Sequence, residues 1–418
     1  MATVLPFKAM RPKPATAVNV TSPPYDVLNS QEAREMAKGN DISLLHVTKP
    51  EIDLDPGISL YDDAVYDKAK TNMERFINDG ILHQDEKPMF YLYRQTMPIG
   101  DKVHSQLGLM ASVSVDEYQN NLIKKHELTR KDKEDDRTKH VYVTHANTGP
   151  VFLTYKAKQS IDNMFAEIEK GTPEYDFTAP DGIRHIMWTV GNSELIEKIK
   201  TEFKSIPVMY VADGHHRSAS AARVRELRKS ENPNHKGDEE YNLFLAVIFP
   251  HDQMNIMDYN RVVKNLNGNS EEEFFTKVEQ KFTINSVGND VPRPKAKHEF
   301  GMYINGKGYI LTPIEGTFDK KDPVLSLDVA IMQNNLLDPI LGIKNPREDK
   351  TIDFVGGIRG LGELKKHVDS GNFKVAFSLY PTSIEDLIDV ADSGNIMPPK
   401  STWFEPKLRD GVAIHMID

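Results

Sequence analysis

The segment VMYVADGHHRSASAARVRELRK, residues 208–229, places charged and small residues directly after an apolar run. The apolar residues predict a buried strand, and the small residues from Ser218 onward predict a helix. The turn Asp213–Arg217 then lies at the amino terminus of that helix. Unpaired backbone N–H groups and the positive end of the helix dipole attract anions there. The segment therefore predicts a phosphate-binding site.

The residues of this turn have different predicted roles. Gly214 lets the backbone come close to a ligand. Arg217 can hold two phosphate oxygens with its guanidinium, and His215 and His216 add N–H donors. Asp213 is better suited to bind Mg²⁺ or to orient a histidine than to contact a phosphate. The competing interpretation is an ordinary helix-capping turn with solvated histidines. A metal site built on the His-His pair is less favoured, because adjacent side chains point in different directions.

A second charged segment, KKHELTRKDKEDDR at residues 124–137, could supply further groups for phosphoryl transfer. Such a reaction needs cations around the phosphates and a carboxylate that accepts the proton of the acceptor. Glu127 is the predicted general base, and it forms the predicted catalytic group with Asp213 and His216. The remaining candidates in this segment are the phosphate contacts Lys125, His126 and Arg130 and the substrate contact Arg137. The alternative is a solvated helix face.

A third segment, MPPKSTWFEPKLRDG at residues 397–411, is stiffened by the proline pair near its start and carries polar side chains. A rigid polar loop suits the wall of a ligand site. Its candidate phosphate contacts are Lys400, Ser401 and Thr402. Two isolated candidates for substrate binding lie elsewhere: Asp26 in SPPYDVL could contact an amine, and Arg261 in DYNRVV could contact a carboxylate. A structural role is the alternative for all of these residues.

The pattern of apolar residues predicts helices that alternate with strands, and hence a mixed α/β fold. Residues 62–79 are expected to form a helix and residues 41–52 a strand. Asn305-Gly306 suits a tight type I′ hairpin turn. The polar, turn-rich residues near 240 predict a boundary between two lobes, residues 1–240 and residues 241–418, with the second lobe closing over the site.

Composition excludes several classes of function. The 418-residue chain has a net charge of −10, which argues against a protein built to coat nucleic acid. It has no cysteine, so it has neither disulfides nor thiolate chemistry. No apolar run is long enough to span a bilayer and no signal peptide is evident, so we expect a cytoplasmic protein without membrane contact. The oligomeric state cannot be read from the sequence.

The motifs together resemble a large bacterial and archaeal family long labelled a domain of unknown function. They are PFKAMRP, PPYDVL, KKHELTR, EDDR, ADGHHR, DYNRVV, DFVGG and MPPKSTWFEPKLRDG, and they extend over nearly the whole chain. The turn ADGHHR is similar to the signature turn of the ParB/sulfiredoxin-like superfamily, which includes archaeal free serine kinases. The resemblance implies a nucleotide-binding core with a second α/β lobe. Sulfiredoxin chemistry is excluded by the missing cysteine, and the acidic balance disfavours a ParB-like DNA-binding role.

Two hypotheses from different classes follow from this resemblance. The first is a kinase that uses Mg²⁺ and ATP or ADP to phosphorylate a free amino acid, with L-serine giving O-phosphoserine. In it the turn Asp213–Arg217 holds phosphates, Asp213 helps to carry Mg²⁺ and Glu127 deprotonates the hydroxyl. The second is a nucleotide-binding regulator without phosphoryl transfer. A nuclease is a third possibility, disfavoured by the acidic balance.

Overall fold

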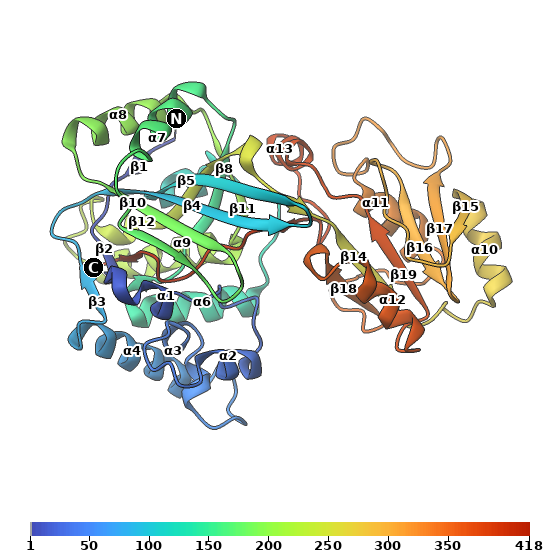
Figure 1. The fold of residues 1–418 in the computed structure, drawn as a ribbon, viewed down its shortest axis with the longest axis horizontal. Coiled ribbons are helices and arrows are strands. Elements are labelled where there is room, and N and C mark those ends of the chain that lie inside the picture. The colour runs from blue at the N-terminus through green and yellow to red at the C-terminus, as the bar shows by residue number, and fades with distance from the viewer. Residues whose placement is uncertain (1) are drawn as a thin grey trace. The chain divides into compact units, whose positions relative to one another are not determined.

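The computed structural model describes residues 2–418 and divides the chain into two compact α/β units (Figure 1). The first unit extends to Met254 and also contains Pro406–Asp418, whereas the second comprises Asn255–Glu405. This differs from the expected boundary after residue 240. Strand β12 (Leu243–Pro250) pairs with two strands of the first unit, so the chain cannot leave that unit before β12 ends.

The first unit is built on a nine-stranded sheet of mixed direction. Along the sheet the strands are β6 (Ile123–Lys124), β11 (Met209–Asp213), β8 (Val151–Tyr155), β12, β5 (Lys102–Ser114), β4 (Phe90–Ile99), β10 (Arg184–Val190) and β9 (Tyr175–Thr178), and β1 (Val4–Leu5) pairs with β5. The pairs β6–β11 and β8–β12 are parallel, and the other pairs are antiparallel. The parallel pair β6–β11 positions the candidate site.

One face of this sheet buries a large apolar core beneath helices. The helices that contribute to this core are α5 (Val115–Gln119), α7 (Gln159–Ile168), α8 (Ser193–Lys204) and α9 (His215–Glu231). Side chains such as Phe165 and Phe203 are fully covered there. Because residues on one face of a strand alternate with those on the other, this core uses every second residue of the central strands.

The opposite face of the large sheet is covered by segments from the amino-terminal and the carboxy-terminal parts of the chain. A smaller sheet contains, in order, β3 (Leu82–Gln84), β2 (Ala9–Pro12), β21 (Ile414–Met416) and β7 (Ala146–Asn147). Gln95 of β4 donates a 2.8 Å hydrogen bond to the carbonyl of Lys407, which ties the carboxy-terminal segment to the large sheet. This segment therefore belongs to the first unit although the second unit precedes it in the chain.

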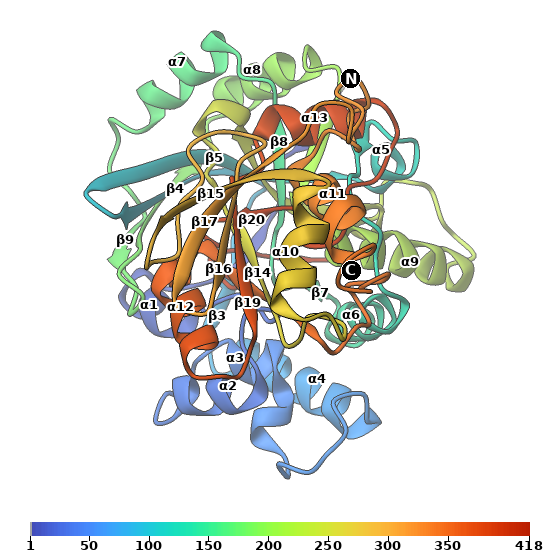
Figure 2. The ribbon, with the colours of Figure 1, turned by 90° about the vertical axis from the view of Figure 1, so that its right-hand side faces the viewer.

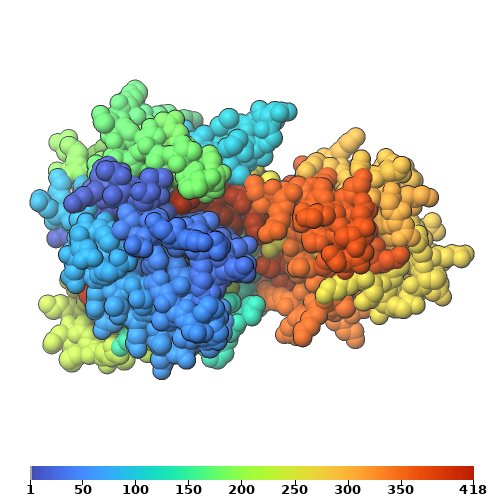
Figure 3. Space-filling model, turned by 60° about the horizontal axis from the view of Figure 1, so that its bottom comes forward, coloured from blue at the N-terminus to red at the C-terminus, as the bar shows by residue number. Residues whose placement is uncertain are grey.

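Most remaining helices of the first unit come from its first 144 residues, which include the continuous blue surface of Figure 3. They are α1 (Ala17–Val20), α2 (Ser30–Ala37), α3 (Leu45–Thr48), α4 (Asp63–Asn78) and α6 (Lys131–Thr144). The expected helix near 62–79 is confirmed by α4. The expected strand over 41–52 is wrong, because Leu44 and Val47, three residues apart, both pack into the apolar cluster that contains Phe76 of α4.

The second unit is a six-stranded antiparallel sheet with helices on both faces (Figure 2). The strands, in order, are β15 (Phe282–Gly288), β17 (Lys307–Pro313), β16 (Phe300–Ile304), β19 (Val375–Leu379), β14 (Tyr259–Val263) and β18 (Ile352–Gly356). The remaining elements are the pair β13 (Ile256–Met257) and β20 (Trp403–Phe404) and the helices α10 (Glu271–Glu279), α11 (Asp328–Met332), α12 (Leu361–Asp369) and α13 (Ile384–Asp392). Asn305 and Gly306 connect β16 and β17 with φ values of 49° and 75°, as a type I′ turn requires.

Candidate functional site

The candidate site lies at one edge of the large sheet, where two parallel strands end side by side. Strand β6 pairs with β11 so that Ile123 faces Met209 and Lys124 faces Tyr210. Parallel neighbours present their carboxyl ends at the same edge. Residues 125–127, which follow β6, and residues 213–217, which follow β11, are therefore brought to one place although they are far apart in the sequence.

The predicted strand, turn and helix are present, but α9 begins at His215 instead of Ser218. Gly214 is the amino-terminal cap and has φ 92°, a left-handed conformation that favours glycine. Glycine has no side chain, so the cap residue itself does not occupy the N–H groups of the first turn. The first-turn N–H groups of an α-helix have no partner within the helix. The geometry thus leaves the amino terminus of α9 available for an anion.

Asp213 is held in an ion pair that the sequence analysis did not predict. Its carboxylate accepts 2.8 Å bonds from Lys407 Nζ and from the backbone N–H of Gly214. Burial acts to raise the pKa of Asp213, but the attraction of Lys407 and Arg217 outweighs it and lowers that pKa to about 2. Asp213 is therefore ionised at neutral pH and forms an ion pair with Lys407.

Several candidate residues line one small pocket. Asp26, Asp213, Gly214 and Arg217 all contribute to its wall, together with Lys407. Asp26 is exposed, and it follows the buried Pro24 that also lines the pocket. The pocket combines the uncapped helix terminus with two cations and two carboxylates.

Arg217 lies beside the pocket and is held on several sides. It donates a 2.7 Å hydrogen bond to the carbonyl of Pro150 and lies 3.4 Å from a carboxylate oxygen of Asp410. The guanidinium carbons of Arg217 and Arg137 lie 5.5 Å and 4.0 Å from the ring centroid of Tyr25. Arg137, a predicted substrate contact, also pairs with Asp136 at 2.8 Å. These contacts fix both guanidinium groups in place.

A cavity of about 30 Å³ next to these side chains is lined by Tyr25, Arg137, Arg217 and Asp410. Asp410 is 1% exposed, and burial raises the pKa of its carboxyl to about 6 against the attraction of Arg217. Gly149 makes room for this carboxylate, because a Cβ atom on Gly149 would lie 2.0 Å from Asp410 Oδ1. The sequence analysis missed Lys407 and Asp410 as site residues, although both lie within the polar segment 397–411.

Replacing Asp410 by asparagine should change how stability depends on pH. The carboxyl ionises near 3.8 in the unfolded chain and near 6 in the folded one, so the folded chain binds the extra proton between these values. The contribution of Asp410 to wild-type stability should fall as pH rises from 4 to 6. The difference in unfolding free energy, Asp410→Asn minus wild type, should increase by about 3 kcal/mol over this interval. Urea denaturation at several pH values checks this, and a pH-independent difference would contradict it.

The other first-unit candidates lie near the turn but face different partners. Lys125 Nζ lies 4.4 Å from the ring centroid of Tyr118. The Arg130 side chain pairs with Asp132 at 2.8 Å, whereas its backbone N–H donates a 3.0 Å bond to His216 Nε2. Because His216 Nε2 accepts this bond, its other ring nitrogen is the donor in the neutral form. His216 therefore remains near the helix terminus, and the Arg130 side chain is turned toward Asp132.

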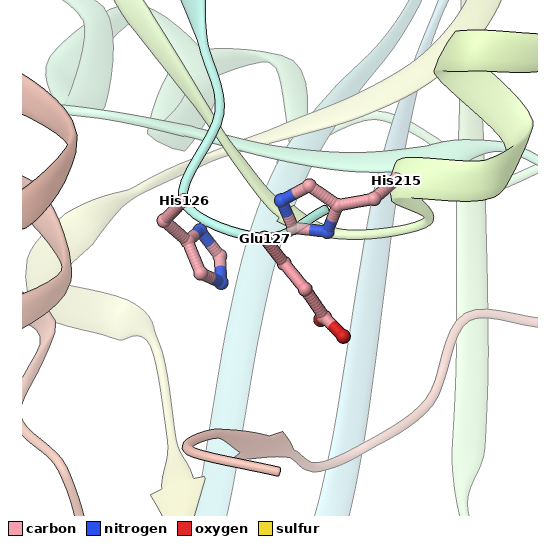
Figure 4. Close-up of side chains that lie close together, drawn as sticks. All are labelled: His126, Glu127 and His215. Carbon is pink, nitrogen blue, oxygen red and sulfur yellow. The ribbon is translucent and has the colours of Figure 1, made fainter. Parts of the chain in front are cut away.

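His126, Glu127 and His215 form a separate group at this edge (Figure 4). His126 and His215 are buried, and their rings meet edge to face with centroids 4.5 Å apart. Burial lowers the pKa of His126 to about 4 and that of His215 well below its usual value. Both imidazoles are neutral at pH 7, so the two histidines do not offer positive charges to a phosphate.

The last four candidates belong to the second unit. Arg261 is buried and donates a 3.0 Å hydrogen bond to the carbonyl of Lys400. Ser401 Oγ donates to the carbonyl of Pro398 at 2.6 Å, and Thr402 is adjacent to it. Segment 397–411 is therefore divided between the units, and the site described above is built from first-unit residues, including Lys407.

The chain belongs to the family described as protein of unknown function (DUF1015), whose model matches residues 4–330. No curated protein matches the chain. Within the described residues, we find no helix with the length and apolar character needed to cross a membrane.

Three solved structures illustrate what the fold is similar to. A conserved hypothetical protein from Pyrococcus furiosus is 13% identical, with 76% of this chain and 97% of that chain covered and a TM-score of 0.34. A free serine kinase in complex with AMP is 12% identical, covering 73% and 91% of the two chains with a TM-score of 0.37. SbnI with a C-terminal truncation from Staphylococcus aureus is 12% identical, covering 72% and 85% with a TM-score of 0.34.

Proposed function

We propose that the chain binds the phosphates of a nucleotide at the amino terminus of α9 and transfers a phosphoryl group to the hydroxyl of a free amino acid. ATP or ADP is the donor, and L-serine is the acceptor that gives O-phosphoserine. The observation that carries the phosphate site is the uncapped terminus at Gly214, which shares one pocket with Arg217 and Lys407. The serine acceptor rests on the resemblance of the ADGHHR turn to that of free serine kinases.

The pocket offers three kinds of contact to phosphate. The backbone N–H groups of the first helical turn supply aligned donors, and the helix dipole favours negative charge. Arg217 supplies a planar guanidinium that can bind two oxygens, and Lys407 supplies a compact positive charge. Lys407 now neutralises Asp213 at 2.8 Å. A phosphate that attracts Lys407 would release the Asp213 carboxylate for another cation.

The residues present fit a magnesium ion. Mg²⁺ prefers oxygen ligands and is commonly held by one or two carboxylates together with substrate phosphates. Asp26 and Asp213 line the same pocket, and Asp213 is ionised at neutral pH. We therefore assign Asp213 to the magnesium site. When bound, the ion would neutralise charge on the phosphates.

We also propose that Asp26 is the general base, which accepts the proton of the acceptor hydroxyl. This carboxylate is exposed and lines the pocket with Gly214 and Arg217. Glu127, the base expected from the sequence, is grouped with His126 and His215. A general base must lie within hydrogen-bond reach of the proton that it accepts. Asp26 meets the pocket directly, and this favours it over Glu127.

A nucleotide-binding regulator remains the alternative function. It needs the helix terminus, Arg217 and Lys407 but no carboxylate positioned as a base. The two functions agree on phosphate binding and differ in turnover, so they are separated by whether the wild-type protein forms a phosphorylated amino acid.

The phosphate site itself is tested by titrating the full-length protein calorimetrically with ADP, AMP and adenosine in the presence of Mg²⁺. If the helix terminus holds phosphates, ADP should bind at least about tenfold more tightly than adenosine, because charge-assisted hydrogen bonds are worth more than about 1.4 kcal/mol. Equal affinity for ADP and adenosine would contradict the proposed site.

A further inference from the structure

We propose that His126, Glu127 and His215 bind a divalent transition-metal ion at the carboxyl ends of β6 and β11. This site is separate from the magnesium assignment, which uses other side chains, and it goes beyond the proposed kinase function. The sequence analysis had disfavoured a metal site because the neighbouring histidines 215 and 216 diverge. The fold supplies the missing ligands from another segment.

The first argument is the convergence of the three side chains. One possible ligand atom from each residue can be chosen so that all three lie within 4.8 Å of one another. Figure 4 shows the two imidazoles and the Glu127 side chain coming together from two separate segments. Metal–ligand bonds of about 2.0–2.2 Å place tetrahedral ligand atoms roughly 3.4 Å apart. The ligand atoms would need to approach one another by at most about 1.4 Å to reach that separation.

The second argument is the state of the ring nitrogens. His126 is 2% exposed and His215 is 5% exposed. Within residues 2–418, Nε2 of His215 has no hydrogen-bond partner, and the ring nitrogens of His126 have none of good geometry, although the backbone of Val211 lies close enough to raise the pKa of His126. Buried polar atoms without partners are rare, because leaving them unsatisfied is costly. A metal ion bonded to one nitrogen of each ring would satisfy two of these three atoms.

The ligand set indicates the class of metal. Imidazole nitrogens suit zinc, iron, cobalt and other first-row transition ions, whereas Mg²⁺ and Ca²⁺ prefer oxygen ligands alone. Two imidazoles and one carboxylate are a set that zinc sites use, and three protein ligands leave at least one position open for water or a ligand. We therefore expect Zn²⁺ or Co²⁺ to bind in preference to Mg²⁺.

The test uses full-length protein stripped with EDTA and titrated with Zn²⁺ alone by calorimetry and with Co²⁺ by visible absorption. We expect one equivalent of either ion, and no competition from equimolar Mg²⁺. Glu127→Gln and His215→Gln should each weaken binding by more than about 100-fold, which exceeds the usual effect of an outer-shell change. His216→Ala is the matched control, because His216 is adjacent to the site but outside the cluster, and it should leave metal affinity unchanged.

Circular dichroism of each variant shows whether it is folded, and Glu127→Gln changes the least buried of the three residues. Absence of Zn²⁺ and Co²⁺ binding by the wild type, or binding that survives both substitutions in folded protein, would overturn the proposed metal site. Tighter binding of Mg²⁺ than of Zn²⁺ would overturn the assigned class. Because these titrations contain no nucleotide, their failure would leave ADP binding, and hence the proposed function, unaffected.

Discussion

Replacing Arg217 by methionine should weaken ADP binding by at least about 30-fold. Among the described residues, Arg217 supplies the only guanidinium on the wall of the pocket at Gly214. Removing a charged partner of a desolvated anion costs about 2 kcal/mol or more. Lysine at this position should recover only part of the loss, because an ammonium group cannot bind two oxygens in a fixed plane. Calorimetric titration with ADP measures the effect.

The matched control for this prediction is Arg223→Met on the same helix. Arg223 is exposed, pairs with Glu134 and Asp135, and does not line the pocket. Its loss should change ADP affinity little. Arg217 also donates to the carbonyl of Pro150 and faces Asp410, so the thermal stability of each variant must be compared. Unchanged ADP affinity in a folded Arg217→Met protein would remove Arg217 from the phosphate site.

Replacing Asp26 by asparagine should lower turnover of L-serine by about 10²–10⁴-fold, the usual contribution of a general base. The substitution keeps the size of the side chain but removes its ability to accept a proton at neutral pH. Nucleotide affinity should change much less, because Arg217 and the helix terminus remain. Steady-state kinetics with saturating nucleotide and serine separate the loss in kcat from any change in KM.

Comparing the kcat of Glu127→Gln with that of Asp26→Asn shows which of the two carboxylates is the general base. If Glu127 were the base, as the sequence suggested, its substitution would produce the larger loss of kcat and Asp26→Asn the smaller. A loss confined to Glu127→Gln would thus contradict the assignment of Asp26. If both substitutions leave turnover unchanged, neither carboxylate acts as the base.

The local parts of this account could be predicted from the sequence. The apolar residues before Asp213 and the small residues after Arg217 are sufficient to predict a strand, a turn and a helix, because they act over a few residues. The start of α9 was placed too late, since the two histidines join the first helical turn. The strand expected over 41–52 was wrong because burial against α4 overrides local strand preference.

The long-range parts of the site could not be predicted in the same way. His126 and Glu127 reach His215 only because β6 pairs in parallel with β11, and nothing in either segment specifies its neighbour in the sheet. Lys407 reaches Asp213 because the chain returns to the first unit after residue 405. A polar segment such as 397–411 gives no local signal that its two halves belong to different units.

Phosphoryl transfer can be followed by ³¹P NMR of the purified protein with Mg²⁺, ATP or ADP, and L-serine. Threonine and homoserine are run in parallel, with Arg217→Met as the control. We expect a new phosphomonoester resonance that requires L-serine and disappears in the variant. Nucleotide binding without a phosphorylated product from any of these acceptors would contradict the kinase and favour the regulator.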